Sequence, residues 1–160
     1  MIPTIQVIEP KKLIGISQSM SLVNNKTALL WQTFMPKHHQ INKGIDMQLI
    51  SLQIYDNGYF TAFNPQTEFT KWACKEVADF DLIPDGMETL ILPAGKYAVF
   101  NYKGLPSTAA SFFNYIFTEW IPNSIYELDN RPYFEILGEK YSNISTDSEE
   151  EVWIPIKDKA

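Results

Sequence analysis

A series of secondary-structure elements that occurs twice along the chain constrains the fold most strongly. The hydrophobic pattern predicts a strand, a helix and two strands within about residues 8–80, and the same series within about residues 88–158. Two such βαββ units can pair their strands into one antiparallel sheet with both main helices on one face. The sequence therefore predicts an α+β fold of duplicated βαββ units, in a single domain over residues 1–160, with a ligand crevice between the halves.

The elements expected in the two halves match in order and in spacing. In the first half they are a helix at residues 26–35, which Pro36 ends, and strands at residues 11–17, 47–55 and 69–77. In the second half they are a helix from about Ser107 to Pro122 and strands at residues 89–92, 96–102, 131–137 and 151–156. Gln53 precedes Trp72 by 19 residues and Glu135 precedes Trp153 by 18, which supports the repeat.

The charge balance argues against a surface that binds nucleic acid directly. The formal net charge is −6, and Arg131 is the single arginine of the chain. Affinity for nucleic acid depends on lysine and arginine side chains that contact phosphates, so no direct nucleic-acid partner is expected. An acidic chain is compatible with a cationic ligand, although acidic surface residues serve solubility in most proteins.

The remaining composition predicts a cytoplasmic protein without metal or cofactor. Cys74 is the only cysteine, so no internal disulfide can form, and its apolar surroundings predict a buried thiol. The N-terminus lacks the pattern of a signal peptide, and no apolar run is long enough to span a membrane. His38 and His39 are adjacent but have no further metal ligands beside them, so we expect them in a surface loop.

Glu135 is the most informative candidate for a functional residue. Strand alternation places Tyr133, Glu135 and Leu137 on one face of their strand, and Phe134 and Ile136 on the other. A carboxylate among apolar groups is costly, and its pKa is expected to rise unless a partner compensates. Such a group is a natural counter-charge for a hydrophobic cation, to which aromatic rings add cation–π contacts. The alternative is an ordinary surface residue on a solvent-exposed face, and the strand alone does not decide between the two.

Three further residues are weaker candidates for the same site. Trp120 ends the apolar stripe of the second predicted helix, where it is either core or a pocket wall. Glu119 lies beside that stripe, a position that is usually on the wet flank of a helix. Tyr126 follows in the next loop, where it either reaches a pocket mouth or lies on the surface.

Three motifs in the second half resemble a known family. They are Trp-Ile-Pro-Asn-Ser-Ile-Tyr-Glu at residues 120–127, Arg-Pro-Tyr-Phe-Glu-Ile at 131–136, and Glu-Val-Trp-Ile-Pro-Ile-Lys at 151–157. In this order they resemble the gyrase-inhibitor-like domains, also known as the AraC-type effector-binding domains of bacterial transcription regulators. The resemblance is best over residues 95–157, and in its pattern of elements it extends over nearly the whole chain.

This resemblance implies a site and several functions. It implies a duplicated βαββ fold in which Glu135 is the buried acid at the pocket floor. Tyr133, Trp120 and Trp153 in the same three motifs are our candidates for the aromatic residues that contact the ligand. Relatives bind lipophilic cations or other small molecules, inhibit DNA gyrase, or hydrolyse cyclopropane-containing natural products. Leu137 replaces a common tyrosine and Ile125 a common glycine, which puts the ligand in doubt more than the fold. Many relatives carry a DNA-binding domain ahead of this module, whereas this sequence is expected to be a freestanding one.

These observations leave three functions open. A small-molecule binding protein is the favoured one. A hydrolase that uses Glu135 or Glu119 is second, because a pocket carboxyl group with a shifted pKa suits both binding of a cation and acid–base catalysis. A protein inhibitor, for example of gyrase, is third, with the acidic stretch at residues 147–151 as its only support. A small aromatic or cationic molecule is therefore the expected partner, with gyrase or a separate regulator as alternatives.

Overall fold

The computed structural model of the protein describes residues 2–41, 44, 48–104, 109–137 and 149–160. The elements of the first half are β1 (Thr4–Ile8), β2 (Lys11–Met20), α1 (Thr27–Phe34), η1 (His38–Gln40), β3 (Leu49–Ile54) and β4 (Phe69–Val77). Those of the second half are β5 (Glu88–Leu92), β6 (Gly95–Lys103), α2 (Ala109–Tyr115), η3 (Ile116–Trp120), α3 (Ile121–Asn123), β7 (Tyr126–Leu128), β8 (Tyr133–Leu137) and β9 (Glu149–Asp158).

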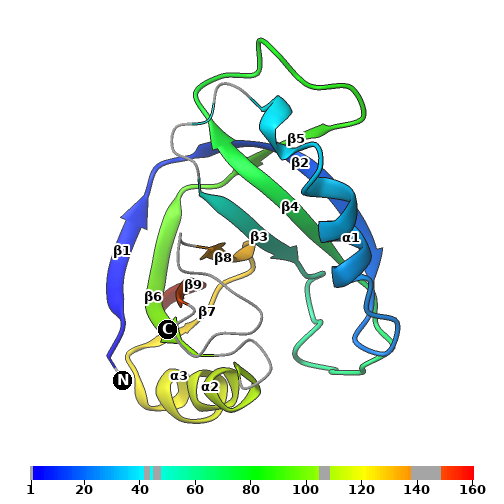
Figure 1. Cartoon of the computed structure of the whole chain (residues 1–160). Helices are drawn as coiled ribbons and strands as arrows, with labels where there is room; N and C mark the ends of the chain where they lie inside the picture. Colours follow the sequence, from blue (N-terminus) through cyan, green and yellow to red (C-terminus); the bar gives the residue numbers. More distant parts are fainter. Residues whose placement is uncertain (1, 42–43, 45–47, 105–108, 138–148) are drawn as a thin grey trace.

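One antiparallel sheet organises the described part of the chain (Figure 1). Eight of its nine strands follow the order β1-β6-β9-β8-β3-β4-β2-β5, and the ninth, β7, pairs with β9. The two halves meet where β3 pairs with β8. The predicted α+β class with an antiparallel sheet is confirmed. The series strand, helix, strand, strand occurs from β2 to β4. Between β6 and β9 the helical segments are followed by three strands, because the short β7 precedes β8, and the duplication of βαββ units stays a prediction.

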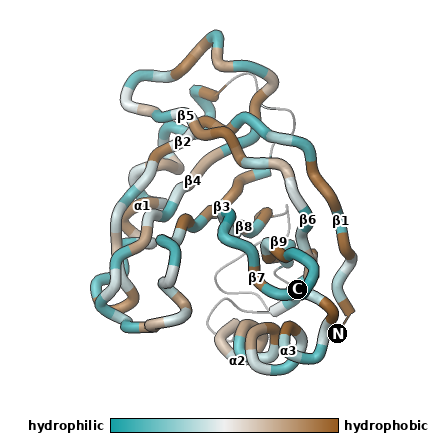
Figure 2. Tube along the Cα trace, turned by 180° about the vertical axis from the view of Figure 1, so that it is seen from behind, coloured by the Kyte–Doolittle hydropathy of each residue, from teal (hydrophilic) through white to brown (hydrophobic). Residues whose placement is uncertain are grey.

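Two bent strands make the sheet curve around an inner core. After Ile8 the chain bends at Glu9 and Pro10 and continues from β1 into β2, and β5 continues into β6 in the same way. Because β1 pairs with β6 and β2 pairs with β5, the two ends of the strand order are joined by continuous chain. The sheet thereby encloses a cluster that includes Leu52, Trp72 and Phe134. At the edge, β1 leaves Val7 exposed, and hydrophobic segments are visible along it (Figure 2).

Pairing across the strands shows that both helices cover the same face of the sheet. Neighbouring residues in antiparallel strands point to the same side, and they form a row that runs Ala73, Ser51, Glu135, Val152 and Phe100. Ala73 belongs to the cluster under α1, which includes Leu30 and Phe34, whereas Val152 and Phe100 belong to the cluster under α2 and α3. Glu135 therefore lies between the two helix-covered regions.

Three sequence-based expectations need correction. Pro122 does not end the second helix, because the helical path runs through α2, η3 and α3 to Asn123. Proline has no N–H to donate to the preceding turn, and η3 directly before it is a wider π-helical turn. Secondly, β1 and β7 were not expected: β7 has only three residues, and β1 lies at one end of the strand order, where it pairs with β6 alone. Thirdly, the last strand is longer than the expected residues 151–156, since β9 begins at Glu149 and ends at Asp158.

The residue that replaces the family's common glycine does not strain the backbone. Ile125 is 72% exposed, and none of the described non-glycine residues has a positive φ. The turn after α3 is held instead by Ser124, whose hydroxyl donates a hydrogen bond to the carbonyl of Ile121 and accepts one from the N–H of Tyr126. A side chain at position 125 is therefore accommodated without glycine.

Candidate ligand-binding site

The middle of the helix-covered face carries a small group of polar residues. Ser51 and Glu135 face each other across β3 and β8, and Gln53 is paired with Lys71 on one side and with Tyr133 on the other. Ser51 and Gln53 are buried, and the amide of Gln53 lies 3.3 Å from the hydroxyl of Ser51. Because strand alternation sends Leu52 and Phe134 into the inner core, these polar side chains all point toward the helices.

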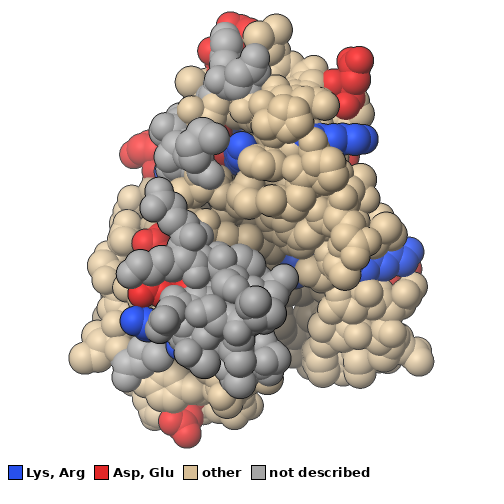
Figure 3. All heavy atoms as spheres, in the orientation of Figure 1, with Lys and Arg blue, Asp and Glu red and all other residues tan. Residues whose placement is uncertain are grey.

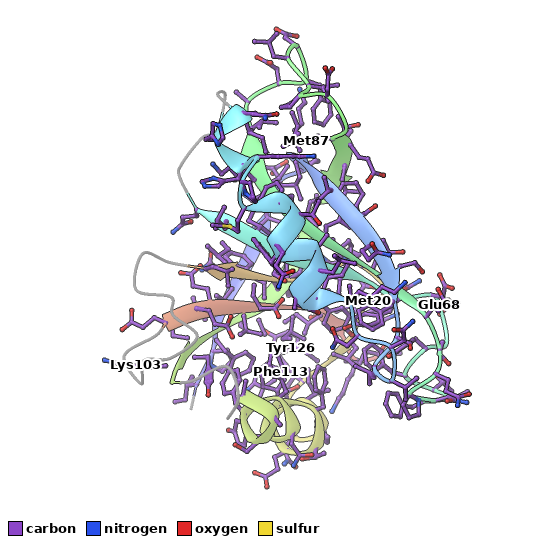
Figure 4. The ribbon with its side chains drawn as sticks, turned by 45° about the vertical axis from the view of Figure 1, so that its right-hand side comes forward. Met20, Glu68, Met87, Lys103, Phe113 and Tyr126 are labelled. Carbon is purple, nitrogen blue, oxygen red and sulfur yellow. The ribbon has the colours of Figure 1, made fainter. Side chains whose placement is uncertain are left out.

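A cavity of about 370 Å³ lies over these residues. Its walls are largely aromatic, and they include Tyr55, Phe60, Phe69, Phe113, Phe117 and Tyr133. Phe113 reaches it from the side of α2 that faces the sheet (Figure 4). Its polar lining consists of Asn25, Gln53, Lys71 and Glu135. Among the described lining residues Glu135 is the only acid and Lys71 the only base.

Tyr133 is the centre of the aromatic wall. Its ring centroid lies 5.3 Å from that of Tyr55, 5.6 Å from that of Phe60 and 6.4 Å from that of Phe117. Burial raises the pKa of both Tyr55 and Tyr133 above the usual range, so both phenols are neutral at physiological pH. The wall thus offers neutral ring faces, which attract cations through their quadrupoles.

The surroundings of Glu135 bring the pKa of its carboxyl group close to neutral pH. Solvent reaches part of the side chain through the cavity, but dense packing on the other sides desolvates the carboxylate and raises its pKa from 4.5 to about 7. The charge of Lys71 and a hydrogen bond from Gln53 lower the pKa, while the charge of Glu150 raises it further. Desolvation is the largest of these effects, so near neutral pH the group exchanges readily between its two forms.

Lys71 is fixed at the opposite end of the polar lining. Its amino group donates a hydrogen bond of 3.3 Å to the hydroxyl of Thr27, the first residue of α1. The side chain of Asn25 lies beside it, and its carbonyl oxygen accepts a hydrogen bond of 2.9 Å from the N–H of Thr27. This end of the cavity therefore presents N–H donors, and the end at Glu135 presents an acceptor.

The structure brings only part of the predicted site together. Tyr133 and Glu135 line the cavity side by side. Trp153 borders it as well, but its indole ring stacks on Phe134 in the inner core, with centroids 5.1 Å apart, because alternation along β9 turns it to the other face. Trp120, Tyr126 and Glu119 are not among the described residues that line the cavity.

The positions of these last three residues follow from the helical path around η3. The ring of Trp120 packs edge-on against Phe100, with centroids 5.3 Å apart, and stacks on Tyr126, with centroids 6.2 Å apart. All three rings belong to the cluster under α2 and α3. Glu119 is exposed on the outer side of η3. In Figure 4 Tyr126 lies between the helices and the strands.

Sequence reasoning missed Gln53, Lys71 and the aromatic residues Tyr55 and Phe60. Gln53 and Lys71 stand in strands that are otherwise largely apolar, and this interruption was the available signal. It could not be interpreted without the register that pairs the two residues with each other and with β8. Phe60 comes from the segment between β3 and β4, whose path over the cavity no periodicity predicts.

Other kinds of site find little support in the described residues. They contain no group of three or more His, Cys, Asp or Glu side chains that could hold a metal ion. They also contain no helix that is both long and apolar enough to cross a membrane. Lysine and arginine side chains are scattered over the face seen in Figure 3 and do not gather into a patch.

Comparisons with known proteins identify the family and the fold of the chain. A family model described as a GyrI-like small molecule binding domain matches residues 1–157. Transcriptional regulator BrlR of Pseudomonas aeruginosa is 28% identical over 145 residues, which make up 90% of this chain and 51% of BrlR. The chain thus spans about half the length of this curated relative.

Two solved structures have the same fold at low sequence identity. SAV2435 bound to tetraphenylphosphonium matches with a TM-score of 0.74 and 17% identity, over 98% of this chain and 94% of that one. The C-terminal domain of EcmrR matches with a TM-score of 0.67 and 13% identity, over 98% of this chain and 97% of that one.

Proposed function

This chain belongs to the family of GyrI-like small molecule binding domains, and on that premise we propose that it binds lipophilic aromatic cations in the cavity at Glu135. The observation that carries the proposal is the position of a single carboxyl group among neutral aromatic rings. Binding in this cavity would serve as the signal of a regulator or as a means of sequestration. Tetraphenylphosphonium, the ligand bound in the structure of SAV2435, is a cation of this kind and supports the proposal.

The physical argument is that a cation removes an electrostatic cost. In the empty cavity an ionised Glu135 is poorly solvated, which is why its pKa rises to about 7. A bound cation supplies the missing counter-charge, while Tyr133 and Tyr55 add cation–π contacts of about 2 kcal/mol when desolvated. A neutral aromatic ligand would gain the apolar contacts and forgo the charge pairing. The site therefore favours cations over neutral molecules of equal size.

A thermal-shift experiment with a matched pair of carboxyl variants tests the proposal. Wild type, Glu135→Gln and Glu119→Gln are compared at pH 8, where Glu135 is ionised, with tetraphenylphosphonium and with the neutral triphenylphosphine oxide. Ligand at a hundred times its Kd stabilises the fold by about 2.7 kcal/mol. We expect the cation to raise the Tm of wild type and of Glu119→Gln, whose changed carboxyl is exposed, and to have little effect on Glu135→Gln. An equal shift in all three proteins contradicts the proposal.

A hydrolase is the second candidate, because a carboxyl with a pKa near 7 can both donate and accept a proton at neutral pH. Glu119 does not line the cavity, so Glu135 is the described residue to which this chemistry would fall. The test is hydrolysis of an activated cyclopropane by wild type and by Glu135→Gln. Hydrolysis at the wild-type rate in the variant excludes Glu135 as the acid or base.

Inhibition of gyrase or another protein stays a prediction of the sequence alone. Part of the acidic stretch that suggested this function forms contacts within the fold. Glu149 forms an ion pair of 3.7 Å with Lys103, and Glu151 accepts a hydrogen bond of 3.2 Å from the indole of Trp153. The described part of this stretch is therefore structural as well as acidic.

A further inference from the structure

The cavity contains two opposite charges that do not neutralise each other by direct contact. Glu135 and Lys71 both line it, and they stand on strands separated by β3. Of the ion pairs among the described residues, none joins these two side chains. Neighbouring strands are about 4.8 Å apart, so the two backbones lie about 10 Å apart across the sheet. Since no ion pair joins them, both charged groups are available to a ligand in the cavity that they line.

The end of the cavity at Lys71 is complementary to an anion. An ammonium group has three N–H donors, and among the described residues only the hydroxyl of Thr27 accepts one from Lys71, so two others can serve a ligand. The amide of Asn25 uses its oxygen on the N–H of Thr27, so its NH₂ group adds two further donors. Asn25 and Lys71 both line the cavity. These donors match a carboxylate or a sulfonate, which accepts several hydrogen bonds at once.

A ligand with a positive charge alone leaves this end unused. It pairs with Glu135 but experiences repulsion from Lys71 across a cavity of about 370 Å³. A molecule with both charges satisfies both ends, and its aromatic part fills the space between Tyr55, Phe117 and Tyr133.

We infer that the preferred ligands of this cavity are aromatic zwitterions, bound with their cationic group at Glu135 and their anionic group at Lys71 and Asn25. The inference rests on the proposed function, because it keeps the cation at Glu135. It adds a second charge requirement that a site for simple cations does not have.

Two acridinium dyes with the same ring system test the inference. N-propylacridinium is a cation, and N-(3-sulfopropyl)acridinium is the corresponding zwitterion. Both are fluorescent, so that Kd can be measured by titration at pH 8. We expect wild type to bind the zwitterion about tenfold or more tightly than the cation. Because this comparison uses wild type alone, it holds even if a variant fails to fold.

Lysine variants identify the residue responsible. Lys71→Met should weaken binding of the zwitterion and strengthen binding of the cation, so that the preference disappears or reverses. Lys37→Met changes an exposed lysine that does not line the cavity and should keep the wild-type preference. Thermal melts without dye establish that each variant is folded.

The outcomes separate this inference from the function on which it rests. If the cation binds wild type and is lost in Glu135→Gln, but the zwitterion binds no more tightly than the cation, the inference is wrong and the proposed function stands. If the zwitterion is preferred to the same degree in Lys71→Met, the assignment to Lys71 is wrong. If neither dye binds wild type and tetraphenylphosphonium does not bind either, both the inference and the proposed function are overturned.

Discussion

Phe134 and Trp153 stack with their ring centroids 5.1 Å apart and their planes at 16°, on the side of the sheet opposite to Glu135. Trp153 is 7% exposed and also contacts Tyr97 edge-on at 5.8 Å. This placement makes the ring part of the inner core, although the residue borders the cavity. Val152 and Ile154 alternate with Trp153 along β9 and also line the cavity, so we expect a ligand to contact their side chains rather than the indole.

The first prediction follows from this position. Trp153→Ala should lower the free energy of unfolding by about 3–5 kcal/mol, because it removes a large buried ring. Trp153→Phe, which keeps an aromatic ring, should cost less and leave the Kd for tetraphenylphosphonium within about twofold of wild type. Urea denaturation and isothermal titration measure the two quantities. A tenfold loss of affinity in a well-folded Trp153→Phe protein would show that the indole takes part in binding.

The close approach of β2 to β4 gives a second prediction. At Gly15, an added Cβ would lie 2.0 Å from the carbonyl oxygen of Ala73 and 2.6 Å from the Cα of Cys74. Both are backbone atoms and cannot rotate away, so Gly15→Ala must push the two strands apart. We expect a loss of about 3 kcal/mol in unfolding free energy.

A second glycine provides the control for this change. Gly58 has a φ of +89° and no atom within 4 Å of an added Cβ, so Gly58→Ala should cost only about 1 kcal/mol through backbone strain. Urea unfolding of both variants gives the comparison. A smaller effect at Gly15 than at Gly58 contradicts the close strand contact.

The sequence predicted much of the sheet because its strands have clear boundaries. The expected strand at residues 69–77 agrees with β4, and alternation correctly placed Tyr133 and Glu135 on one face and Phe134 on the other. Alternation says which residues share a face within one strand, but it does not say which strand lies beside it. The pairing of Ser51 with Glu135 therefore became known only from the structure.

The aromatic candidates were harder to place for a related reason. Trp120, Tyr126 and Trp153 lie in the motifs that resemble the family, yet each is turned toward packed core instead of into the cavity. The walls come largely from residues outside those motifs, such as Tyr55 and Phe60. A large aromatic side chain serves a core and a binding site equally well, so residue type alone does not separate the two.

Stability should depend on pH through Glu135. Its pKa is 4.5 in the unfolded chain and about 7 in the folded protein, so between these values the folded state binds more protons. Its contribution is fully present below pH 4.5 and is lost as pH rises through 7, with a total of about 3 kcal/mol.

Glu135→Gln isolates this contribution. The variant has no proton to lose, so its unfolding free energy should fall less than that of wild type between pH 5 and pH 8. Urea denaturation at these two pH values measures the difference, and Glu119→Gln, which changes an exposed carboxyl, should follow wild type. Parallel pH profiles for wild type and Glu135→Gln would show that the carboxyl has an ordinary pKa in the folded protein.

Binding of a simple cation should show the opposite pH dependence. Only the ionised form of Glu135 pairs with tetraphenylphosphonium, and this form dominates above the pKa of about 7. Affinity should therefore rise by up to tenfold per pH unit below 7 and level off above it. Lys71 and Glu150 also act on Glu135, in opposite directions, so Lys71→Met should move the midpoint to higher pH. Isothermal titration from pH 5.5 to 8.5 measures the profile. A Kd in wild type that is as independent of pH as that of Glu135→Gln would remove Glu135 as the counter-charge of the ligand.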